Sequence, residues 1–427
     1  MTDQQAARHT VRVYYTANGL FTVAASLIWG VNTLFLMRAG LDILGVMAVN
    51  AAFTVGQLVC EVPTGVVADT VGRKVSFVVG TVTLAVATVL YVIAEQMHLG
   101  IGWFIGASLL IGLGFTFQTG STDAWLVDAL DHVGYSGSME RVFARGGMIF
   151  GGAMLVGTIS GGFLGQLDLA YPYYLRAVVL VVASVYAIFV MHDIGFAPRP
   201  LVWNRFGAET RAIFDVGIKF GWRNATVRPL MFASLAQGLF FIFGFYSWQR
   251  YFLDLLGREA VWVTGVVSAG FALAGIAGNA LVGRIQRNLV RRGRTGRLLG
   301  IVALAQAVLA AAVGLVGVLW PAARPGVTPF MIVVTLYLAF GLMQGLAAPV
   351  RQALINRHIP SAQRATVLSV DSFFGDVGGS GGQLGLGWLS KTISIPVAWI
   401  VGGAILLGAV PAYRSAENAD ASAENPS

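Results

Sequence analysis

The chain of 427 residues is 56% hydrophobic and only 11% charged, with a mean hydropathy of +0.73. A soluble globular domain carries about 25% charged residues, so this composition excludes one and predicts an integral membrane protein. The formal charge of +8 could suggest nucleic acid, but in a membrane protein excess Lys and Arg marks the cytoplasmic face. We therefore expect no nucleic-acid partner.

Apolar stretches of roughly 20 residues, the length that crosses a bilayer core about 30 Å thick, recur between charged breaks. We place them near 15–37, 45–67, 75–95, 102–127, 143–166, 172–191, 229–251, 259–283, 298–320, 328–350, 363–389 and 393–413. The sequence therefore predicts an all-α integral membrane protein with 12 transmembrane helices.

The segment between the sixth and seventh stretches is richer in Pro, Arg and Asp than the chain before it. This predicts two six-helix bundles, at 1–191 and 229–413, joined by a linker at 192–228. Within the linker, the spacing of apolar and charged residues over 208–222 predicts an amphipathic helix on the cytoplasmic membrane surface. The polar tail at 414–427 is expected to be disordered.

The basic residues indicate the orientation. If both termini are cytoplasmic, 22 of the 28 Lys and Arg residues fall on the inner side and 6 on the outer side. Because cytoplasmic loops are enriched in Lys and Arg, the sequence predicts that both termini are cytoplasmic.

A charged turn joins the second and third apolar stretches and reads G-V-V-A-D-T-V-G-R-K over 65–74. Gly65 would let two helices approach closely and Gly72 would permit the turn. Asp69 offers a carboxylate to a helix N-terminus or an arginine. Arg73 and Lys74 are expected to stay in the cytoplasm.

This loop, G-x-x-x-D-x-x-G-R-K between two spans, resembles the signature loop of the major facilitator superfamily. The residue after the Asp is usually basic in that family and is Thr70 here. The preceding 61–64, E-V-P-T, resembles a bacterial branch with many drug-type exporters. The resemblance implies two pseudo-symmetric six-helix bundles, alternating access, and a place in the bacterial inner membrane.

A glycine motif in the fifth stretch, G-T-I-S-G-G at 157–162, resembles the family's antiporter motif G-P-x-x-G-G. Thr158 stands where proline is expected, which weakens the antiporter implication. The alternative is that Gly157, Gly161 and Gly162 serve close packing of the fifth and eighth spans. The two interpretations are compatible.

Ionisable groups inside the membrane cost several kcal/mol unless they are paired or face a polar cavity. One set of such residues is predicted to lie at similar depth near the cytoplasmic surface: Glu61, Asp69, Asp123, Arg145, Arg364 and Asp371. The resemblance implies that these charges, with Gly65, Gly72, Arg73 and Lys74, form an inner gate. A static charge network that fixes helix register is the alternative.

Asp376 is predicted to lie deeper than these groups. It is twelve residues beyond Arg364, or about 18 Å along a helix, near the bilayer midplane. A carboxylate there is expected to exchange protons when its surroundings change. The alternative is a neutral Asp bonded to backbone freed by the glycines that follow.

Aromatic and amide side chains at helical spacing predict a substrate wall. The candidates are Trp29, Asn32, Phe115, Gln118, Gln237, Phe241, Trp248 and Gln344, with Arg351 on the face of Gln344. Such a surface suits an amphipathic ligand. Lipid-facing or packing roles are the alternative.

We expect no metal and no cofactor, because the five histidines and one cysteine form no ligand pattern and no phosphate-binding loop is present. The predicted function is secondary transport: proton-coupled efflux of a small amphipathic compound or drug by a monomer in the lipid bilayer. The alternatives are proton-coupled uptake of a small metabolite and, from another class, a membrane-embedded lipid-modifying enzyme. We expect no enzyme, because the polar groups are spread over many helices.

Overall fold

The computed structural model describes residues 3–196, 215, 217–289, 295–320, 325–359 and 363–424, and every regular element in these ranges is helical. Within these ranges, ten helical segments are long and apolar enough to cross a membrane. The first predicted span is not among them because its helix is interrupted at 27–31, and the eleventh is not because its helix carries polar residues and many glycines. The protein is therefore an all-helical, multi-pass membrane protein.

The chain forms two compact units. The first contains residues 1–41, 52–203 and 261–269, and the second contains 42–51, 204–260 and 270–427. Two helices thus begin in one unit and continue in the other.

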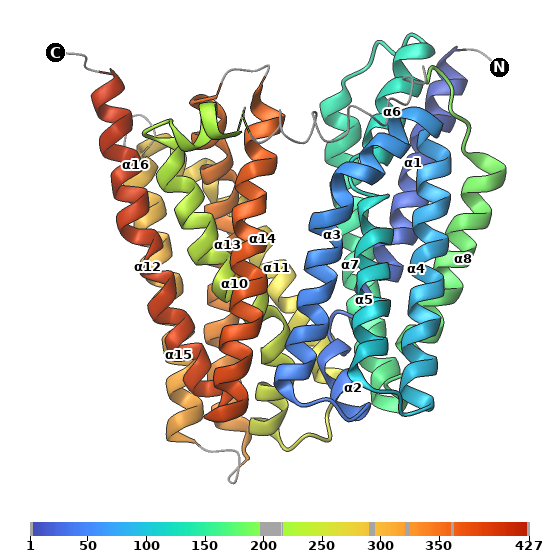
Figure 1. Ribbon diagram of the computed structural model, residues 1–427. Coiled ribbons are helices and arrows are strands. Elements are labelled where there is room, and N and C mark those ends of the chain that lie inside the picture. Colours follow the sequence, from blue (N-terminus) through green and yellow to red (C-terminus); the bar gives the residue numbers. More distant parts are fainter. Residues whose placement is uncertain are drawn as a thin grey trace. The chain divides into compact units, whose positions relative to one another are not determined.

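The first unit contains α1 (Asp3–Ser26), α2 (Asn32–Arg38), most of α3 (Ile43–Val71), α4 (Arg73–Gln96), α5 (Ile101–Thr116), α6 (Ser121–His132), α7 (Met139–Leu167) and α8 (Tyr171–Val190). Two predicted spans are broken in this unit (Figure 1). The first is interrupted at 27–31, between α1 and α2, and the fourth at 117–120, where Gly120 adopts a φ of 71°.

The second unit contains η2 (Gly217–Trp222), α10 (Val227–Leu256), most of α11 (Trp262–Leu289), α12 (Thr295–Leu319), α13 (Val327–Arg357), α14 (Arg364–Thr392), α15 (Ile395–Leu406) and α16 (Ala409–Glu424). In Figure 1, α15 and α16 follow one another, interrupted at Leu407 and Gly408.

The predictions for the linker and for the tail agree with the structure only in part. Most of the predicted amphipathic helix at 208–222 lies outside the described residues, and its last part is the π-helical turn η2. The tail from 414 was predicted to be disordered, whereas α16 continues to Glu424. Alanine and glutamate, which favour helix, recur through this segment and explain the difference.

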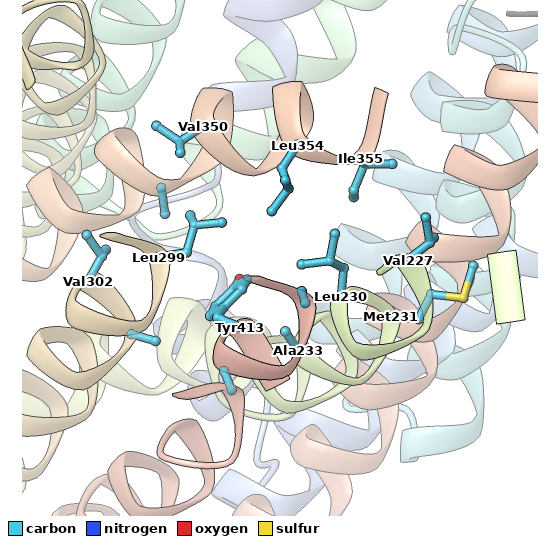
Figure 2. Packing of buried hydrophobic residues seen from close by; sticks show 14 of the residues in the cluster. Val227, Leu230, Met231, Ala233, Leu299, Val302, Val350, Leu354, Ile355 and Tyr413 are labelled. Carbon is cyan, nitrogen blue, oxygen red and sulfur yellow. The ribbon is translucent and has the colours of Figure 1, made fainter. Parts of the chain in front are cut away.

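Buried hydrophobic side chains form one core of the second unit, and Figure 2 shows members of it from four helices. Leu230 of α10, Leu299 of α12, Val350 of α13 and Tyr413 of α16 are each at most 1% exposed. Fully burying one such side chain stabilises the fold by about 1.5–3 kcal/mol. This core holds the cytoplasm-predicted ends of four helices together around the charged pair described below.

Candidate functional sites

The signature loop is a sharp turn at Gly72 between α3 and α4. Gly72 has a φ of 128°, a conformation that only glycine adopts readily. A Cβ atom added there would also collide with the carboxylate of Asp193, which follows α8. Both the backbone angle and the lack of space therefore require glycine at this position.

Charged groups surround this turn. Asp69 Oδ1 lies 2.7 Å from Arg73 Nη2, and Arg73 Nε lies 3.9 Å from Asp128 Oδ2. The backbone N–H of Lys74 donates to Asp193 Oδ1 at 2.9 Å. We call Asp69, Arg73, Lys74, Asp128 and Asp193 the loop cluster. It ties the start of α4 to α3, α6 and the segment after α8.

Asp193 is a member of the loop cluster that the sequence analysis missed. Its carboxylate accepts from the first turn of α4, where a negative charge is favoured by the helix dipole. Burial nevertheless raises the pKa of the Asp193 carboxyl, and the Lys74 backbone N–H and the Lys74 and Arg73 cations only partly offset this effect. No sequence pattern links Asp193 to a loop 119 residues away.

Several predicted gate residues lie elsewhere. Glu61 and Gly65 are exposed on α3, and a Cβ atom on Gly65 would meet no heavy atom within 4 Å. Gly65 therefore does not mediate a close helix contact in this structure, which corrects the expected role. Asp123 accepts from the Tyr14 hydroxyl at 2.7 Å, and exposed Arg364 donates to the Asn356 carbonyl at 3.2 Å.

A buried ion pair lies in the second unit. Arg351 Nη2 of α13 donates to Asp371 Oδ1 and Oδ2 of α14, at 2.6 and 2.7 Å. The Asp371 carboxylate also accepts from the Ser234 hydroxyl of α10 at 2.8 Å. The ion pair and the Ser234 hydroxyl thus join three helices. The sequence analysis had instead placed Arg351 in the substrate wall and Asp371 in the gate.

The surroundings of this pair are almost dry. The side chain of Asp371 is 7% exposed and that of Arg351 is 15% exposed. The fully buried Tyr413 ring packs beside Arg351, and Arg351 Nη2 also donates to the Leu230 carbonyl at 3.2 Å. Removing one partner of such a pair strongly destabilises the fold, because the other partner is left as an uncompensated buried charge.

The antiporter-like glycines make close helix contacts. A Cβ atom on Gly157 would lie 2.7 Å from the Val23 carbonyl oxygen of α1, and one on Gly161 would collide with the Leu27 backbone. A Cβ atom on Gly162 would lie 2.6 Å from the backbone nitrogen of Gly265, in the part of α11 that belongs to the first unit. All three glycines therefore lie at close backbone contacts, but only Gly162 meets the eighth span, and Gly157 and Gly161 meet the first.

The same device recurs in the second unit. Cβ atoms on Gly378 and Gly382 of α14 would collide with backbone carbonyls of Leu235 and Leu239 in α10. The glycine clusters of α7 and α14 each pack against the first long helix of their own unit. This common role favours an internal repeat.

In the first unit, the predicted substrate residues have different surroundings. Asn32 is 6% exposed and accepts from the Tyr173 hydroxyl at 2.9 Å, and buried Gln118 donates to the Phe77 carbonyl. Trp29 is half-buried in the turn before α2. Half-buried Phe115 forms edge contacts with two further aromatic rings, Phe21 of α1 and Phe53 of α3.

In the second unit, Gln237 and Phe241 are half-buried on α10. Trp248, by contrast, is 2% exposed and packs against the rings of Phe252 and Tyr337. The prediction that Trp248 lines a substrate wall is therefore corrected. Trp248 belongs to an aromatic core that covers the last turns of α10.

Gln344 of α13 accepts a hydrogen bond from Gln306 of α12 at 2.7 Å. Seven aromatic residues, among them Phe241 and Phe271, and Gly244 enclose a cavity of only about 10 Å³, which is room for about one water molecule. Such a cavity cannot hold an organic substrate.

Two polar residues occupy one face of α14 beyond the ion pair. Asp376 is half-buried, and Gln383 is seven residues further on, which is the same helical face. Gln383 is 0% exposed, and neither its amide oxygen nor its nitrogen has a hydrogen-bond partner among the described residues. Buried polar groups are normally satisfied, so Gln383 is a further candidate for contact with a ligand or water. The i, i+7 spacing from Asp376 could have revealed it.

Comparisons with known proteins define the class. The sequence profile of the Major Facilitator Superfamily matches residues 14–382. The chain belongs to this superfamily and is a transporter rather than an enzyme. No curated protein matches it.

Solved structures share the fold at low identity. A POT family transporter in complex with 5-aminolevulinic acid has a TM-score of 0.73 and 13% identity, with 94% of each chain covered. The nucleoside transporter NupG has a TM-score of 0.73 and 12% identity, with 96% of this chain and 98% of that chain covered. The human organic anion transporter MFSD10 (TETRAN) has a TM-score of 0.60 and 14% identity, with 95% and 99% covered.

Proposed function

We propose that this protein is a proton-coupled secondary transporter that exports a small amphipathic compound from a bacterial cell by alternating access. The proposal includes twelve membrane spans in two six-helix bundles, with α1 and α2 as the first span and α14 as the eleventh. Both termini are placed in the cytoplasm by the distribution of Lys and Arg.

The polar face of α14 carries the proposal. A carboxylate in a helix that crosses a membrane is costly and is therefore a candidate functional group. Asp371 has its partner in Arg351, so its charge is held in place. Asp376, on the same helix and half-buried, is the proposed proton site, and Gln383 is a proposed polar contact for the substrate.

The substrate class is inferred from the aromatic residues that remain partly accessible. Phe115 contacts the rings of Phe21 and Phe53 in the first unit, and Phe241 is half-buried in the second. Aromatic surface with few amide groups favours a mostly apolar ligand with one or two polar groups. A sugar, with its many hydroxyls, would be poorly satisfied there.

The loop cluster is proposed to bias the conformational equilibrium and not to bind substrate. A salt bridge joins the turn to α6, and a backbone hydrogen bond joins it to the segment after α8, within one unit. A ligand or proton can shift an equilibrium only by binding the two states differently. The loop cluster would set the ratio of the two states in the absence of substrate and proton.

The test is transport into inverted membrane vesicles. A panel of amphipathic dyes and drugs is offered with and without an imposed pH gradient, and vesicles without the protein serve as the control. Accumulation that requires an acidic lumen supports proton-coupled export. Accumulation in right-side-out vesicles only would instead establish uptake, and pH-independent movement would exclude proton coupling.

A further inference from the structure

A basic groove lies between the beginning of α1 and the beginning of α7. It has a volume of about 410 Å³ and lies wholly within the first unit. Its lining includes four arginines and no acidic residue: Ala7, Arg8, Val11, Arg12, Tyr15, Tyr135, Gly137, Ser138, Arg141, Val142 and Arg145.

The four arginines form two rows. Arg8 and Arg12 are four residues apart on α1, and Arg141 and Arg145 are four residues apart on α7, so each pair shares a helix face. All four are exposed. Like charges at this spacing repel one another, and the repulsion is relieved when an anion lies between the rows.

The walls of the groove are held at a fixed spacing. The Tyr15 hydroxyl of α1 donates to the Val142 carbonyl of α7 at 2.8 Å. The neighbouring Tyr14 ring forms edge contacts with Phe143 and Phe150 of α7. The groove is therefore built by packed helices and does not depend on the positions of long side chains alone.

Helix α7 adds a second attraction for an anion. It begins at Met139 beside the groove, and Ser138 caps it by accepting from the Arg141 backbone N–H at 3.3 Å. The N-terminus of a helix carries a partial positive charge. Glu140 is the acidic residue of this turn, and its carboxylate accepts from the Ser138 hydroxyl at 2.6 Å.

Apolar surface continues directly from the arginines. Val11 and Val142 lie in the lining itself. Met148 and Ile149, three and four residues beyond Arg145 on the membrane-capable helix α7, are 70% and 42% exposed. A ligand that matches both features has an anionic phosphate head and an apolar body.

We propose that this groove binds the headgroup of an anionic phospholipid, with its acyl chains along the exposed apolar face of α7. Guanidinium groups bind phosphate oxygens through paired hydrogen bonds, and basic pockets between transmembrane helices hold anionic headgroups. The site is separate from the loop cluster and from the polar face of α14, and it gives Arg145 a role other than the predicted gate.

The experiment measures lipid retained by the purified full-length protein, using native mass spectrometry in detergent. Phosphatidylglycerol and phosphatidylcholine with identical chains are added in equal amounts. The wild-type protein is expected to retain phosphatidylglycerol preferentially. The variant Arg12→Gln/Arg145→Gln should lose that preference by at least about tenfold, since it removes two charge-assisted contacts to the phosphate.

A charge-matched control is Arg223→Gln/Arg228→Gln, which removes two exposed arginines of the second unit and should leave the preference unchanged. Because Arg12 and Arg145 are also exposed, the single variants should fold, and each should show a smaller loss. Equal retention of both lipids by the wild-type protein would overturn the proposal. Displacement of the lipid by an equal concentration of inorganic phosphate would also overturn it, because the site would then bind the free anion.

Discussion

Arg351 and Asp371 form a two-point ion pair, at 2.6 and 2.7 Å, that joins α13 to α14 in the interior of the second unit. The first prediction is that Asp371→Asn lowers the free energy of unfolding by about 3–5 kcal/mol, because Arg351 is left as an uncompensated buried cation. The joint replacement Arg351→Met/Asp371→Leu should recover most of this loss. Thermal unfolding in detergent measures both. Unchanged stability of the single variant would show that the pair is dispensable.

The second prediction concerns pH. Burial raises the pKa of Asp193 above its ordinary value of 3.8, so the folded protein binds this proton more tightly than the unfolded chain. The stabilisation from Asp193 is therefore complete below pH 3.8 and is lost as pH rises through the folded-state pKa. Asp193→Asn should remove this decline. The unfolding temperatures of the wild-type protein and of Asp193→Asn, measured from pH 3.8 upward, test this prediction. Parallel curves of unfolding temperature against pH would contradict it.

The third prediction uses the open space beside Gly65. A Cβ atom there meets no heavy atom within 4 Å in this structure, so Gly65→Ala should fold normally. If another helix approaches Gly65 in the alternate state, the variant should still transport several-fold more slowly. Gly102→Ala, at an equally open and exposed glycine of α5, is the matched control. Equal transport by all three proteins would remove Gly65 from the conformational cycle.

The fourth prediction separates a core aromatic residue from a candidate substrate contact. Trp248→Ala should lower the free energy of unfolding by about 3–5 kcal/mol, because Trp248 is buried against Tyr337. Phe115→Ala should instead weaken substrate binding by about 1–3 kcal/mol, with a smaller effect on unfolding. The two variants are compared by thermal unfolding and by ligand binding. Normal stability with lost affinity in Trp248→Ala would reverse the assignment.

The family and the signature loop could be predicted from the sequence because both depend on local spacing. Gly72, Asp69 and Arg73 lie within five residues of one another, and the apolar runs on either side have membrane length. The structure places Asp69 and Arg73 in contact at 2.7 Å. Asp193 could not be predicted, because its place over Gly72 depends on how α8 packs against α4.

The long-range pairing of charges was also beyond sequence reasoning. Asp371 was predicted to belong to the gate and Arg351 to the substrate wall, and helical spacing says nothing about which residue of a neighbouring helix a side chain meets. Trp248 was misplaced for the same reason, since a periodic stripe does not tell whether its face meets a cavity or another helix. The helix interruptions at 27–31 and 407–408 contain no proline, so no strong helix-breaking residue indicated them.

The central claim, proton coupling through α14, is tested most directly by Asp376→Asn in inverted vesicles. The variant mimics a permanently protonated carboxyl, so protonation can no longer shift the balance between the two states. With an imposed pH gradient, the wild-type protein should concentrate its substrate against a gradient. The variant should not, while exchange of labelled for unlabelled substrate continues. Undiminished uphill transport by Asp376→Asn would contradict the account and move the coupling site to another carboxylate.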